Sequence, residues 1–269
     1  MNRVGSYHIK PFSKFRRNIT LIIHEGWRKH ATHELLELDV TQGKQLIKQY
    51  KETTGNPLSF TGWIVKCAAQ ALSEHKQLNA YRKGRKIYYF DDVDVPIPIE
   101  RKINGEDVPM AYIIRRTTEK SLEDITKEIN QAINQTPDGN KQLLGRKSYT
   151  WLERFALTSP LILQKLLIRV VRNRPLLRKK YMGTLAVTAV GMKGKITGWI
   201  IPMGGTTTIL IVVAGIMKKP RVINDEILVR DILHVTITTD HDLIDGGPLA
   251  RFTERFIELI EQGYSIPKP

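Results

Sequence analysis

A histidine and an aspartate four residues apart form the chemically most suggestive stretch of the sequence. Residues 235–239 (VTITT) alternate β-branched side chains and predict a strand. The strand leads into a polar turn that holds His241, Asp245 and paired glycines, and an amphipathic helix follows from Ala250. A histidine at a strand end, before glycines that let a backbone or a ligand come close, is suited to act as a general base. An incidental histidine in a surface turn is the alternative interpretation.

Length and composition indicate an ordinary globular protein. The chain of 269 residues can bury a sizeable core, and its contents of 41% hydrophobic and 26% charged residues are unexceptional. Its single cysteine, Cys67, excludes an internal disulfide and fits a reducing compartment such as the cytoplasm. Because Cys67 lies in a helical apolar run, we expect a core residue rather than a nucleophile. The N-terminal residues lack the apolar core of a signal peptide.

Charge is distributed unevenly along the chain. The formal net charge is +15, and the stretch from Arg154 to Asn224 carries 13 Lys or Arg residues without any Asp or Glu. Such a block could meet nucleic acid, an anionic membrane or a phosphorylated cofactor, or could simply be a solvated face. Nucleic acid is disfavoured, because the block lacks the interleaved aromatic residues of a base-stacking platform.

Residues 196–217 are uncharged and long enough to span a bilayer. Pro202, paired glycines and three consecutive threonines interrupt the run, so we expect two buried strands joined at residues 203–205. The first of these strands would contain Ile200 and Ile201.

Helices and strands are interspersed along the rest of the chain, which predicts an α/β protein with one large mixed sheet flanked by helices. Three helices should begin at serines, with Ser13 and Ser121 as capping residues and the third helix running from Ser59 to His75. Residues 86–95 should form a strand pair or a single strand, which Pro96 and Pro98 break. Further expected elements are a hairpin turn at residues 104–105, strands at 34–40, 108–114 and 185–190, and an element at 226–233 that precedes the final strand.

Residues 138–182 predict a helical, basic insertion within a single domain of residues 1–269. The apolar residues at helical spacing are accompanied by seven cations in the second half, at Lys165, Arg169, Arg172, Arg174, Arg178, Lys179 and Lys180. Residues 161–180 could lie on an anionic membrane surface as a basic amphipathic helix, or could be a packed insertion with solvated cations.

A colinear series of motifs resembles the catalytic domain of the dihydrolipoamide acyltransferases of 2-oxo acid dehydrogenase complexes, relatives of chloramphenicol acetyltransferase. The His-x-x-x-Asp-Gly segment at His241 is the central motif of the series. The other motifs are 11–17 (PFSKFRR), 38–41 (LDVT), 59–61 (SFT), 68–69 (AA), 78–80 (LNA), 121–125 (SLEDI), 185–191 (LAVTAVG) and 250–252 (ARF).

The resemblance implies a role for each matching residue. His241 would take the proton from the thiol of coenzyme A or of a dihydrolipoyl group, so that the thiolate attacks an acyl thioester. Thr188 replaces the family's serine, whose hydroxyl stabilises the oxyanion, and Asp245 would form a structural ion pair with Arg16. The resemblance also implies a homotrimer with His241 and Thr188 from neighbouring chains, coenzyme A as a substrate, a lipoyl group supplied in trans, and no metal.

Several positions depart from the family pattern. Asp242 stands where the family has a basic or small residue, and Glu106–Ile114 differs from the family strand that lines the thiol channel. We expect no lipoyl domain before residue 1, and the C-terminus lacks the apolar tail that joins trimers into large cores, which favours a free trimer. A non-catalytic trimeric scaffold with the same fold, or a membrane-surface acyltransferase with a non-lipoyl acceptor, is the alternative to the enzyme proposed above.

Overall fold

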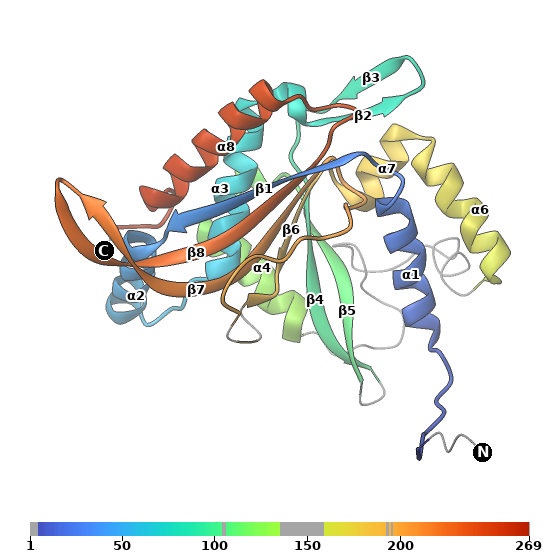
Figure 1. Ribbon diagram of the computed structural model, residues 1–269, viewed down its shortest axis with the longest axis horizontal. Helices are drawn as coiled ribbons and strands as arrows, with labels where there is room; N and C mark the ends of the chain where they lie inside the picture. The colour runs from blue at the N-terminus through green and yellow to red at the C-terminus, as the bar shows by residue number, and fades with distance from the viewer. Residues whose placement is uncertain (1–4, 104–105, 135–158, 192–193, 195, 269) are drawn as a thin grey trace.

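A mixed four-stranded sheet forms the centre of the protein (Figure 1). The computed structural model describes residues 5–103, 106–134, 159–191, 194 and 196–268. The strand order is β1-β8-β7-β6, with β6 parallel to β7 and the other neighbours antiparallel, which confirms the expected mixed sheet. The strands are β1 (Ala31–Asp39), β6 (Leu185–Ala189), β7 (Ile209–Ile223) and β8 (Glu226–Asp240).

Helices α3 (Phe60–Glu74) and α8 (Gly246–Glu261) cover one face of this sheet (Figure 1). Alternate residues of β8, at Leu233, Val235 and Ile237, are fully buried in the same apolar cluster as residues of both helices. Burying a side chain of this size contributes about 1.5–3 kcal/mol. The expected flanking of the sheet by helices is therefore confirmed.

The opposite face of β8 is polar but equally buried. His234, Thr236 and Thr238 are at most 3% exposed. The Trp199 ring lies edge-on to His234 at 4.6 Å between centroids, and the Trp199 indole N–H donates to the carbonyl of Leu36 (2.8 Å). The irregular segment around Trp199 therefore covers this face of the sheet.

The remaining elements surround the sheet. β2 pairs with β3 and β4 pairs with β5, each pair antiparallel. These elements are α1 (Lys14–Gly26), α2 (Thr41–Thr54), β2 (Ala80–Lys83), β3 (Lys86–Tyr89), β4 (Val95–Ile103), β5 (Glu106–Ile114), α4 (Leu122–Asn134), α6 (Leu161–Arg172) and α7 (Pro175–Met182).

The predicted capping roles of Ser13 and Ser121 are confirmed, and Ser59 caps its helix in the same way. The side-chain oxygen of Ser13 accepts the N–H of Arg16 (3.3 Å), and Ser59 accepts that of Gly62 (3.0 Å). Ser121 accepts the N–H of the third following residue (3.1 Å). Each bond satisfies a backbone donor that the first turn of a helix leaves free.

Three expectations about strands were wrong. Pro96 and Pro98 lie inside β4, where the only described partner is β5, so no second neighbour requires the missing N–H groups. Ile200 and Ile201 form no strand, because their segment leaves the sheet to cross its face. Residues 226–240 form one strand rather than two elements, because β7 pairs with them from Glu226 onward. Residues 104–105, the expected hairpin turn, lie outside the described residues.

The segment expected to form a basic insertion contains α6 and α7, which lie beside α1 (Figure 1). Arg172 of α6 forms an ion pair with Glu25 of α1 (2.7 Å). α6 has no buried residue, and Ile162 is 84% and Leu166 55% exposed. Residues 138–158 of the insertion lie outside the described part of the chain. Among the described residues, no helix is both long and apolar enough to cross a membrane.

Candidate active site

His241 lies directly after β8, in the turn that leads to α8. Its backbone N–H donates to the carbonyl oxygen of His30 (2.9 Å), which continues the β1–β8 ladder beyond the pair Ala31 and Asp240. The side chain of His241 is exposed. The ladder therefore fixes the backbone of the candidate base while the imidazole remains accessible.

The residue after the base is engaged with a second histidine. The Asp242 carboxylate lies 2.9 Å from Nδ1 of His30, and the Asp242 backbone N–H donates to the Asp240 carboxylate (3.3 Å). The hydrogen bond with Asp242 raises the pKa of His30, and the same bond lowers the pKa of Asp242. His30 was not singled out from the sequence, because no motif contains it.

Asp245 occupies the N-cap position of α8, although its side chain makes no capping hydrogen bond. Asp245 and Arg16 are both exposed, and in the described part of a single chain they form no ion pair with each other. Arg16 lies in the first turn of α1, where the helix dipole disfavours a cation. The ion pair between them stays a prediction.

Thr188 lies on β6, at a partly buried position. It pairs with Val212 of β7, and Val212 pairs with Thr236 of β8, so the three residues form one row across the sheet. His241 follows Thr236 by five residues, which is roughly 16 Å along the strand. One chain therefore does not bring the candidate oxyanion donor and the candidate base together.

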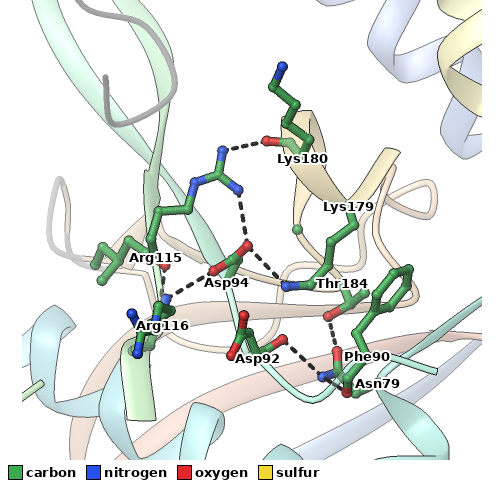
Figure 2. A network of polar contacts seen from close by, with 12 residues as sticks. Asn79, Phe90, Asp92, Asp94, Arg115, Arg116, Lys179, Lys180 and Thr184 are labelled. Carbon is green, nitrogen blue, oxygen red and sulfur yellow. Dashed lines mark hydrogen bonds and ion pairs between the residues drawn. The ribbon is translucent and has the colours of Figure 1, made fainter. Parts of the chain in front are cut away.

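A network of polar contacts surrounds Asp94, directly before β4 (Figure 2). Asp94 is only 7% exposed. Its carboxylate accepts hydrogen bonds from Arg115 (3.0 Å), from Lys179 of α7 (3.0 Å) and from the backbone N–H of Arg116 (2.9 Å). Burial alone would raise the pKa of Asp94, but these donors outweigh it and lower the pKa. The network ties α7 to the start of β4.

Two further contacts hold the start of β6. The hydroxyl of Thr184 donates to the side-chain oxygen of Asn79 (Figure 2), and the hydroxyl of Tyr81 donates to the carbonyl of Gly183. Burial raises the pKa of Tyr81 to about 12, so its phenol stays protonated and can donate near neutral pH. These contacts fix the strand four residues before Thr188.

A cavity of about 670 Å³ borders the Asp94 network. Its three carboxylates and three cations balance, so the lining carries no net charge that would select an anion. The lining residues are Phe90, Asp91, Asp92, Asp94, Arg115, Leu176, Lys179 and Lys180. Neither His241 nor Thr188 belongs to the lining, so this cavity is not the site predicted from the sequence.

Two buried titratable residues, Lys29 and Cys67, have strongly shifted pKa values. Burial, with a smaller contribution from Arg178, lowers the pKa of Lys29 to about 7, and the Lys29 amine donates to the carbonyl of Thr207. Lys29 directly precedes His30 but carries no sequence signal. Cys67 is confirmed as a core residue with 0% exposure, and burial raises the pKa of its thiol.

Comparison with known proteins places this geometry in context. The sequence profile of the family "2-oxoacid dehydrogenases acyltransferase (catalytic domain)" matches residues 5–143 and 165–266. The unmatched residues 144–164 fall within the expected insertion. The lipoamide acyltransferase component of the branched-chain alpha-keto acid dehydrogenase complex of Bacillus subtilis (strain 168) is 26% identical over 254 residues, covering 93% of this chain and 49% of the relative. The chain thus spans about half the length of that relative.

Two solved structures share the fold. A probable dihydrolipoamide acetyltransferase from Listeria monocytogenes 4b F2365 has a TM-score of 0.72 at 21% identity, covering 97% of each chain. The cubic core of a pyruvate dehydrogenase multienzyme complex has a TM-score of 0.70 at 16% identity, covering 96% of this chain and 93% of the other. Because the family profile matches most of the chain, in two segments, the chain belongs to the family of 2-oxoacid dehydrogenase acyltransferase catalytic domains.

Proposed function

We propose that the protein moves an acyl group between coenzyme A and a thiol, either a dihydrolipoyl group supplied in trans or another small acceptor. The observation that carries the proposal is the position of His241, whose backbone is fixed by the sheet while its imidazole is exposed. The names of the relatives, which refer to lipoamide and to acyl transfer, support it. The reaction consumes one free thiol and releases another, so we infer a reducing compartment such as the cytoplasm.

His241 would act as the general base. Its imidazole takes the proton of the attacking thiol, and the resulting thiolate adds to the carbonyl carbon of the acyl thioester. The Thr188 hydroxyl donates to the oxyanion of the tetrahedral intermediate. When the intermediate collapses, the departing sulfur takes the proton back from the His241 imidazolium, so the enzyme ends in its starting state.

The active site would be shared between two copies of the chain. Thr188 and His241 are separated by two strand spacings, about 10 Å, across the sheet and by roughly 16 Å along it. A single thioester carbonyl cannot contact both groups of one chain at hydrogen-bond distance. We therefore propose a homotrimer in which His241 of one chain faces Thr188 of its neighbour, and the similarity to a subunit of a cubic core supports a multi-copy assembly. Asp245 and Arg16 would form their ion pair in that assembly.

Residues 161–180 carry a second candidate role, attachment to an anionic membrane surface. One exposed face of α6 carries the apolar Ile162 and Leu166 together with Lys165 and Arg169, so it offers both apolar contact and positive charge to such a surface. Pelleting with vesicles that contain anionic lipid should fall in Arg169→Glu but not in the control Lys48→Glu on α2. Equal pelleting of both variants, or none by the wild type, would dismiss this role. The same cations could instead meet the phosphates of coenzyme A.

Acyl transfer from acyl-coenzyme A to free dihydrolipoamide tests the proposed enzyme. The His241→Ala variant should lose roughly 10²–10⁴-fold in kcat, the usual contribution of a general base. The control His24→Ala removes an exposed histidine at the end of α1 and should retain the wild-type rate. Equal rates for wild type and His241→Ala would instead support a scaffold that kept the fold without the activity.

A further inference from the structure

Two histidines lie opposite each other where the sheet ends. Ala31 and Asp240 are the last pair of the antiparallel ladder. One position beyond that pair, the His241 N–H donates to the His30 carbonyl (2.9 Å). His30 is therefore a direct neighbour of the candidate base.

Asp242 directly follows His241 in sequence, and the structure pairs its carboxylate with His30. The His30 Nδ1 and Asp242 Oδ1 atoms are 2.9 Å apart, across a separation of 212 residues. The His30 side chain is 83% exposed and that of Asp242 44%, so solvent screens their attraction and the value of the pair for stability is small. The role of the pair is therefore to fix the position of the Asp242 carboxylate.

A carboxylate that accepts a hydrogen bond from an imidazole stabilises the protonated ring, and a protonated ring cannot serve as a base. Asp242 directly follows His241 and would be free to interact with it in this way if nothing else held the carboxylate. We propose that His30 is a positioning residue for His241, which holds the base through its backbone carbonyl and keeps the Asp242 carboxylate engaged through its imidazole. The inference rests on the proposed function, and it explains how this chain accommodates an acidic residue after its catalytic histidine.

The charges around the pair agree with this role. Asp242 raises the pKa of His30 through the hydrogen bond and its charge, and Asp240 adds to the rise. The pKa of Asp242 is lowered first by the His30 hydrogen bond and then by the charges of His30, Arg82 and His241. Both members of the pair are therefore charged at pH values between the lowered pKa of Asp242 and the raised pKa of His30. Above that window, neutral His30 can still donate from Nδ1.

A double-mutant comparison tests the role of His30. In kcat/KM profiles against pH, His30→Ala should move the acid limb upward by about 1 pH unit, because the freed carboxylate then acts on the base. The double variant His30→Ala/Asp242→Asn should return the limb to the wild-type position. His30→Asn, which keeps a donor near Nδ1, should also preserve the wild-type limb. An unshifted limb in His30→Ala, or a shift that persists in the double variant, would overturn the proposal.

A second measurement separates this proposal from the proposed enzyme. Titration of the imidazole NMR signals requires no activity, so it can be read even if the wild type transfers no acyl group. The midpoint of the His30 signal should fall in Asp242→Asn, and the control Asp91→Asn should leave it in place. A His30 midpoint that is the same in the wild type and in Asp242→Asn would show that the pair does not form in solution.

Discussion

Thr188 lies on β6, two strands away from β8, and His241 lies five residues beyond Thr236, the residue of β8 that is level with Thr188. Thr188 is level with Val212 and Thr236, whereas His241 follows the last residue of β8. Val212 lies between the two strands and is paired with both, so it fixes their relative register at this row. The proposed reaction, in which His241 deprotonates the thiol and Thr188 binds the oxyanion of the same thioester, therefore needs a second copy of the chain.

Replacing Thr188 by valine tests the oxyanion role. Thr188→Val keeps the β-branched shape but removes the hydroxyl, so kcat should fall by roughly 10²–10³-fold, as for other lost oxyanion donors. Thr236→Val is the matched control, because Thr236 lies in the same row of the sheet. Steady-state rates measured side by side should show a loss for Thr188→Val alone. A similar loss in both variants would point to damage of the sheet rather than to a lost donor.

Thr236→Val should also change stability, in the favourable direction. The Thr236 hydroxyl is buried with no hydrogen-bond partner among the described residues. Removing an unsatisfied buried hydroxyl should raise the free energy of unfolding by about 1 kcal/mol. Urea denaturation at pH 7 measures this change. A loss of stability would show that the hydroxyl finds a partner in the assembled protein.

Asp94→Asn should destabilise the fold. The substitution removes the negative charge that Arg115 and Lys179 share, and breaking a buried ion pair from one side costs about 3–5 kcal/mol. The melting temperature should fall clearly. Asp91→Asn, at an exposed carboxylate on the same cavity, is the control and should have little effect. Equal melting temperatures for both variants would contradict a structural role for the network.

Lys29 should make stability depend on pH. Burial lowers its pKa to about 7 from 10.5, so between these values the unfolded chain binds a proton that the folded chain does not. The free energy of unfolding is therefore not reduced by Lys29 above the unfolded pKa of 10.5, and it falls as the pH decreases from there toward 7. Lys29→Met removes the penalty.

Melting temperatures at pH 7 and pH 9.5 measure this effect. The gain of Lys29→Met over the wild type should be larger at pH 7 than at pH 9.5. The control Lys127→Met, at an exposed lysine on α4, should show the same difference at both values. A gain that is independent of pH would mean that the Lys29 amine is charged in the folded protein across this range.

Local signals in the sequence predicted much of the fold. Serines located the starts of three helices, and alternation of β-branched residues located the end of β8 and hence His241. These features depend on residues within a few positions of one another. The resemblance to the acyltransferases supplied Thr188, which no local pattern marks as functional.

The missed features all depend on tertiary contacts. His30 meets Asp242 across 212 positions, and Asp94 meets Lys179 across 85. The strand wrongly predicted at Ile200 and Ile201 has the same origin. The neighbouring Trp199 donates a hydrogen bond to the carbonyl of Leu36, a contact between segments far apart in the sequence. A single sequence contains no periodicity that encodes such pairs.

Complementation between two inactive variants tests the shared active site most directly. His241→Ala and Thr188→Val chains, co-expressed with different tags and purified through both, form mixed trimers in which one interface of three holds both intact groups. Such trimers should recover about one third of the wild-type rate, although either variant alone is inactive. Mixed oligomers no more active than the separate variants would contradict a site built from His241 of one chain and Thr188 of the next.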